Sequence, residues 1–154
     1  MTMQLFMSVI SHLRIAAFGV IVAIVIGVAI GIFLTRYRKL AGVIMSIADI
    51  IQTIPTLALL SILMILFGLG DTTVIIGLAL YSLLPIIRNT YVGILNIPKG
   101  LIEAGMGIGM TNTQLLYKVE LPIAMPIILS GIRIAFVTAL GITTIGVLIG
   151  AGGL

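Results

Sequence analysis

The chain is dominated by long apolar stretches separated by short polar segments. Four stretches approach or exceed the roughly 20 residues needed to cross a bilayer, at about residues 15–34, 41–67, 73–92 and 122–149. Their apolar positions are continuous rather than alternating, and an open sheet in lipid would leave backbone groups without partners. The pattern therefore predicts an all-α fold, a polytopic transmembrane helix bundle forming one domain over residues 1–154.

Composition supports a membrane protein and excludes several other classes. Hydrophobic residues make up 61% of the chain and charged residues 8%, whereas soluble domains are about 25% charged. Disordered chains are poor in apolar residues, so disorder is excluded as well. With no Cys and one His, we expect neither a disulfide framework nor a metal site. The first apolar stretch lacks a preceding basic region and a cleavage site, which argues against a signal peptide.

The basic residues predict how the bundle is oriented. The loops after the first and third spans carry basic side chains, namely Arg36, Arg38, Lys39, Lys99 and Lys118. The loop at 68–72 has none and holds one acid, Asp71. By the positive-inside rule, the first and third loops face the cytoplasm and the N-terminus lies outside.

The longest polar segment, residues 93–121, follows the third span. Pro98 suits the first turn of a short helix over Lys99–Ile108, and the glycines that follow can end it. Thr111 to Gln114 resembles a capping box that opens a second short helix. Leu121-Pro122 is then expected to turn the chain back into the membrane. Physical chemistry alone leaves open a simple amphipathic connector on the lipid headgroups.

This segment carries a spaced motif. The motif begins with Glu103-Ala104-Gly105, and three residues separate this run from Gly109. Nine residues separate Gly109 from Val119, and one residue separates Val119 from Leu121-Pro122. The run resembles the EAA loop of binding-protein-dependent ABC importer permeases, whose pattern is E-A-A, three, G, nine, I, one, L-P. Gly105 and Val119 are conservative departures.

The resemblance extends over essentially the whole chain. It includes residues 50–58, 88–90, 97–98 and 150–154. The Gln-Thr-Ile-Pro run at 52–55 looks most like the quaternary-amine branch, which carries glycine betaine, carnitine or choline.

The resemblance implies a fold and a mechanism. The fold would be the ABC importer permease (MetI-like) core, with a fifth helix beyond Leu154. The cytoplasmic loop would dock on a separate ABC ATPase subunit and couple its closure to alternating access. The coupling residues would be Glu103, Ala104, Gly105, Gly109, Leu121 and Pro122. Without the family, Glu103 would be read as a solvated helix charge.

The resemblance also implies partners and a location. The partners would be that ATPase, an extracytoplasmic substrate-binding protein and a second permease copy or paralogue. The location would be the inner (plasma) membrane of a prokaryote. The chain has no G-x-x-x-x-G-K-[ST] motif and no catalytic constellation. We therefore expect a transport subunit without a cofactor, whose partner ATPase binds ATP and Mg²⁺.

The aromatic residues of the chain bear on how a substrate would be recognised. A quaternary ammonium would be held by an aromatic cage, yet the chain has no Trp and four Tyr. High-affinity recognition would then belong to the external binding protein. The alternatives are a permease for another small solute, such as methionine or sulfonate, and a passive channel.

Three charged residues lie inside the predicted spans. Asp49 is about nine residues into the second span, roughly 13 Å from its end, and Arg133 lies at similar depth in the fourth. Intramembrane charges usually face a cavity or a partner, so we expect Asp49 to pair with Arg88 or Arg133. The pair would be either a gating link on the pathway or a static ion pair. Arg88 alone would snorkel to the interface.

Other features bear on the pathway and the packing. Pro55 and Pro85 can break helices and free carbonyls, and Gln52 and Thr53, just before Pro55, are candidate pathway residues. His12 is expected to be an interfacial residue. Small residues recur every four positions in the first span and predict close helix packing, at Gly19, Ala23, Gly27 and Gly31.

Overall fold

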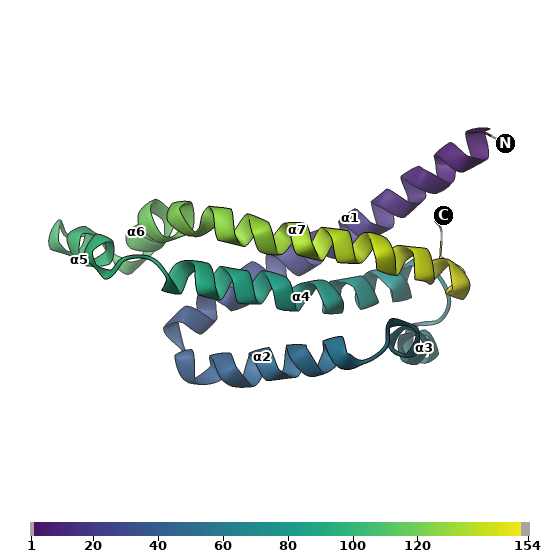
Figure 1. The fold of residues 1–154 in the computed structure, drawn as a ribbon, viewed down its shortest axis with the longest axis horizontal. Helices are drawn as coiled ribbons and strands as arrows, with labels where there is room; N and C mark the ends of the chain where they lie inside the picture. The colour runs from purple at the N-terminus through teal and green to yellow at the C-terminus, as the bar shows by residue number, and fades with distance from the viewer. Residues whose placement is uncertain (1, 152–154) are drawn as a thin grey trace.

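A computed structural model describes residues 2–151. In this range every regular element is a helix (Figure 1). The elements, in chain order, are α1 (Thr2–Arg36), α2 (Arg38–Thr53), α3 (Thr56–Phe67), α4 (Asp71–Leu95), α5 (Lys99–Gly107), α6 (Asn112–Leu115), a π-helix η1 (Leu116–Glu120), α7 (Leu121–Gly146) and a 3₁₀ turn η2 (Val147–Ile149). Helices α5 and α6 lie at one end of the bundle, and α1 begins and α7 ends at the other (Figure 1).

Helix α4 is the centre of the bundle. Half of its most apolar stretch is buried, against a third for α1 and for the α7 span. The main core cluster joins α1, α3, α4 and α7 through buried residues such as Val20, Leu60, Leu78 and Ala139. By length and composition three helices could cross a membrane, or four if α2 and α3 form one broken span.

The predicted small-residue stripe is confirmed as a packing surface. A Cβ added to Gly19, Gly27 or Gly31 would lie within 2.8 Å of a side-chain atom of α4. Ala23, in the same stripe, is fully buried. Without side chains at these positions the two backbones approach closely, as small-residue motifs allow in membranes.

The second predicted span is not one continuous helix. α2 ends at Thr53 and α3 begins at Thr56, and the two axes differ by 98°. Ile54 takes an extended conformation, with φ −70° and ψ 127°, because a residue that precedes Pro is driven out of the α region. Pro55 therefore breaks the helix, as predicted, and α2 and α3 together form either one broken span or a re-entrant loop.

The expected turn at Leu121-Pro122 was also wrong. From Asn112 to Ile149 the chain is one helical rod of 38 residues. Its π-helical part places the N–H of Leu121 against the carbonyl of Leu116, five residues back. Pro122 has no N–H to donate to the carbonyl four residues back, and the wider π turn lies just before it. The helix adapts its register at this point and continues.

His12 is buried against the protein, with 7% of its surface exposed. Its Nε2 lies 3.1 Å from the backbone oxygen of Leu140 on α7. Helix α1 begins well before Ile15, so His12 lies within the helix and contacts α7.

Candidate functional site

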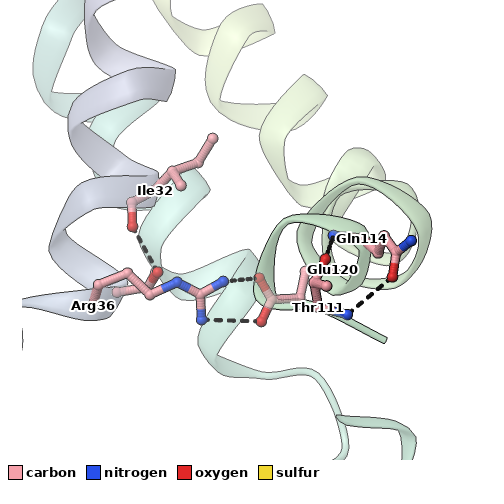
Figure 2. Close-up of polar contacts among 6 residues, drawn as sticks. Ile32, Arg36, Thr111, Gln114 and Glu120 are labelled. Atoms are coloured by element: carbon pink, nitrogen blue, oxygen red, sulfur yellow. Dashed lines mark hydrogen bonds and ion pairs between the residues drawn. The ribbon is translucent and has the colours of Figure 1, made fainter. Parts of the chain in front are cut away.

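The loop between α4 and α7 is held in a defined shape by local hydrogen bonds. Gly109 adopts a left-handed φ of 84°, and the amide of Met110 bonds to the carbonyl of Gly105 at 3.1 Å. This is the Schellman geometry that ends a helix at glycine. The predicted capping box is confirmed, because Thr111 Oγ1 accepts from the Gln114 amide and Gln114 Oε1 accepts from the Thr111 amide (Figure 2).

The motif residues divide into exposed and buried positions. Glu103, Ala104 and Gly109 are exposed, and exposed apolar side chains, namely Leu101, Met106 and Ile108, share the α5 region with them. An outward surface that combines apolar side chains with one carboxylate suits contact with another protein. Gly105, in contrast, is buried, and a Cβ there would lie 2.6 Å from Leu115 Cδ1. Its small size therefore lets α5 pack against α6.

The last motif residues anchor the loop to the bundle. Leu121 is partly buried and packs against a cluster of Ile94, Ile97, Ala124 and Ile128. Pro122 is exposed. Leu121 thus fixes the start of α7 against the end of α4.

The structure adds an ion pair that the sequence analysis missed. Arg36, the last residue of α1, donates two hydrogen bonds to Glu120, the last residue of η1, at 3.2 and 2.5 Å (Figure 2). The Glu120 side chain is only 5% exposed, whereas that of Arg36 is 44% exposed. This two-pronged contact connects α1 to the helix that follows the loop. The sequence contained a signal for this pair. Glu120 directly precedes Leu121-Pro122, and the basic Arg36 follows the first apolar span.

Asp49 pairs with Arg88, one of its two expected partners. Arg88 Nη2 lies 3.0 and 3.1 Å from the two Asp49 carboxylate oxygens. Arg133 is exposed, and within the described part of the chain it makes no ion pair. The contact joins α2 to α4 in the half of the bundle nearer the loop.

Gln52 and Tyr81 form a second link between α2 and α4, at a place in α4 where Pro85 removes a helical hydrogen bond. Pro85 lacks the N–H that would bond to the carbonyl of Tyr81 within α4. Gln52 Nε2 donates to this carbonyl at 2.8 Å. In return the Tyr81 hydroxyl donates to the carbonyl of Ile54, at the α2–α3 break. Pro85 thus frees a carbonyl, as predicted, but does not break α4, and a side chain of α2 donates to that carbonyl.

This reciprocal arrangement predicts a coupled effect on stability. Gln52→Leu is expected to destabilise the full-length protein by about 1–2 kcal/mol, because the buried Tyr81 carbonyl loses its donor. In a Pro85→Ala background the restored helical N–H should reduce this cost. The measurement is unfolding of the four variants of the cycle in detergent. Strictly additive effects would mean that the Gln52 hydrogen bond does not replace the N–H that Pro85 lacks.

A cavity of about 440 Å³ lies beside these two links. Its lining comes from α2, α4 and α7 and comprises Gln52, Tyr81, Leu84, Pro85, Arg88, Asn89, Ile134 and Thr138. Thr53 does not line it, and its hydroxyl bonds to the Ile50 carbonyl of its own helix. Among the described residues no three His, Asp or Glu side chains gather to hold a metal ion. The arrangement is therefore a cavity lined by both polar and apolar side chains, and none of its lining residues belongs to the loop between α4 and α7.

Comparison with known proteins identifies the family. Residues 19–154 match the family described as "Binding-protein-dependent transport system inner membrane component". The chain is 50% identical over 143 residues to the glycine betaine/carnitine/choline transport system permease protein OpuCD of Bacillus subtilis, covering 93% of this chain and 62% of the relative. It is 49% identical to the carnitine transport permease protein OpuCD of Listeria monocytogenes, covering 93% of this chain and 64% of that protein.

Solved structures agree with this assignment. A chain of the MetNI methionine ABC transporter, from a study of its inward-facing conformations, superposes with a TM-score of 0.87 and 30% identity. The match covers 99% of this chain and 77% of that one. The chain spans just over three fifths of the length of the two permease relatives. It belongs to the family of binding-protein-dependent transport system inner membrane components.

Proposed function

We propose that this chain is the membrane-spanning permease subunit of an ATP-driven importer for quaternary-ammonium osmolytes, namely glycine betaine, carnitine and choline. The 50% identity to a permease named for these three solutes carries the proposal. The polar cavity between α2, α4 and α7 supports it, because a permease needs a path lined by more than apolar side chains.

The assembly follows from the same proposal. The loop from Gly93 to Leu121 lies at the cytoplasmic face and docks on a separate ATPase, which binds ATP and Mg²⁺. An extracytoplasmic binding protein delivers the substrate, and a second permease copy or paralogue completes the pathway. Basic residues at the loop end of the bundle support this orientation, with the N-terminus on the opposite side.

Glu103 is the charged contact of the docking surface in this proposal. It is exposed on α5, beside the exposed apolar side chains of Met106 and Ile108. A carboxylate in such a surface complements a basic residue of the ATPase, and reversal of its charge places like charges together.

The test is uptake of labelled substrate into vesicles that contain the full-length permease, its ATPase and its binding protein. We expect ATP-dependent uptake of at least one of the three osmolytes. Glu103→Lys should reduce it by about tenfold or more, as loss of one interfacial charge pair does. Lys118→Glu is the matched control, because Lys118 is also exposed in this segment but lies outside the motif.

Each outcome has a separate meaning. Uptake without ATP would replace the importer with a passive channel. ATP-dependent uptake of methionine or a sulfonate alone would keep the importer and change its substrate. Equal loss in Glu103→Lys and Lys118→Glu would remove the specific role of Glu103.

A further inference from the structure

Asp49 and Arg88 form a charged pair that is deep within its helices and yet half exposed. Arg88 lies seven residues before the end of α4, about 10 Å along the axis. Asp49 lies eleven residues after the start of α2, about 16 Å along it. Their side chains are 49% and 50% exposed. Charges at such depth are costly against lipid and usually face water or a partner, so we expect this exposed pair to face water or another molecule rather than lipid.

The pair leaves much of its hydrogen-bonding capacity unused. Only Nη2 of Arg88 contacts Asp49, although a guanidinium carries five N–H donors. Within the described residues, neither side chain makes another hydrogen bond. Both charged groups can therefore engage a further partner.

The adjoining cavity has room for such a partner. Arg88 lines it together with polar groups of Gln52, Asn89 and Thr138. Its volume of about 440 Å³ lies within the range of small-molecule sites, roughly 300–1,000 Å³. Thr138 belongs to α7 and is exposed, and Asp49 lies outside the lining but contacts it through Arg88.

We propose that Asp49 and Arg88 form a contact site for zwitterionic substrates within the membrane. The substrate carboxylate binds Arg88, its quaternary ammonium lies against Asp49, and the two side chains pair again when the substrate leaves. This inference rests on the proposed function and adds the residues that touch the substrate along its path.

The charge balance favours a zwitterion over a simple ion. The pair is neutral, so a cation alone would compensate Asp49 and leave Arg88 without a counter-charge. An anion alone would do the reverse. An unpaired charge at membrane depth is unfavourable. A zwitterion compensates both side chains at once, and the exchange of partners leaves no charge uncompensated.

This mechanism separates the three osmolytes by chemistry. Glycine betaine and carnitine carry a carboxylate, whereas choline carries a hydroxyl. Arg88→Gln should reduce uptake of the two zwitterions by about tenfold, the loss typical of one charge-assisted contact, and reduce choline uptake about twofold or less. Asp49→Asn should reduce all three, because each carries the quaternary ammonium.

The experiment uses the full-length permease with its ATPase and binding protein in proteoliposomes, with the binding protein saturated. Maximal uptake of carnitine and of choline is normalised to wild type. Lys39→Gln is the matched control, because it removes one cation from α2 outside the cavity lining. Basal ATPase activity reports whether each complex is assembled. NMR saturation transfer from the complex to carnitine and to choline, without binding protein or ATP, gives a readout independent of transport.

A fall in the carnitine-to-choline ratio in Arg88→Gln, by either readout, is the expected result. If choline gives no signal in wild type, a lost carnitine signal in both Arg88→Gln and Asp49→Asn is the expected result. Unchanged binding, or equal loss for carnitine and choline in Arg88→Gln, would overturn the proposal. Absence of ATP-dependent uptake by wild type would instead count against the proposed function, and the binding measurement would still decide the role of the pair.

Discussion

Arg36→Gln is expected to destabilise the full-length protein by about 3–5 kcal/mol, the cost typical of removing one partner from a buried ion pair. The substitution leaves the Glu120 carboxylate, which is 5% exposed, without its counter-charge. It also disconnects the end of α1 from the helix that follows the loop. The measurement is the free energy of unfolding in detergent, by denaturant titration.

The reverse substitution should cost less. In Glu120→Gln the Arg36 side chain, 44% exposed, can turn its charge toward water. The double variant Arg36→Met/Glu120→Leu should be less destabilised than Arg36→Gln, because no charge remains buried. Equal costs for Arg36→Gln and Glu120→Gln would show that burial of the carboxylate does not govern this site.

Gly131→Ala is expected to destabilise the protein by about 3 kcal/mol, at the upper end of overpacking effects. A Cβ at Gly131 would lie 2.7 Å from the backbone oxygen of Pro85 and 2.7 Å from Asn89 Cβ. The backbone oxygen cannot move without shifting α4, the central helix. Unfolding of the full-length protein in detergent gives the measurement.

Gly141 provides the matched control on the same helix. A Cβ there meets nothing within 4 Å, so Gly141→Ala should stabilise α7 by roughly 0.5–1 kcal/mol through helix propensity alone. If the two alanine variants had the same stability, the close approach of α4 and α7 at Gly131 would be incorrect.

Local sequence signals were sufficient for much of the fold. Apolar length located the helices, Pro55 located the break, and the capping box at Thr111 located the start of α6. Each depends on residues within a few positions of one another. The Asp49–Arg88 contact could also be predicted in part from the sequence. The predicted spans contain few charged residues, so Asp49 had only two candidate partners, both arginines.

Other features depended on distances that a sequence does not contain. Arg36 and Glu120 are 84 positions apart, and only the packing of α1 beside the α7 rod brings them together. The 98° angle between α2 and α3 follows from how α3 meets the core, since Pro55 requires a break but no particular direction. Leu121-Pro122 was misread as a turn because a π-helical register can carry a helix past proline.

The π-helix at Leu116–Glu120 has a consequence for the direction in which α5 points. A π turn holds one residue more than the α-helix around it, and each residue of an α-helix turns the chain by about 100°. The residues before the π turn are therefore rotated about the helix axis from the positions that an uninterrupted α-helix of the same sequence would give them. The face that the loop presents at the end of the bundle is set by the number of residues in this turn as much as by their chemistry, and the turn lies within the fixed spacing between Gly109 and Leu121-Pro122.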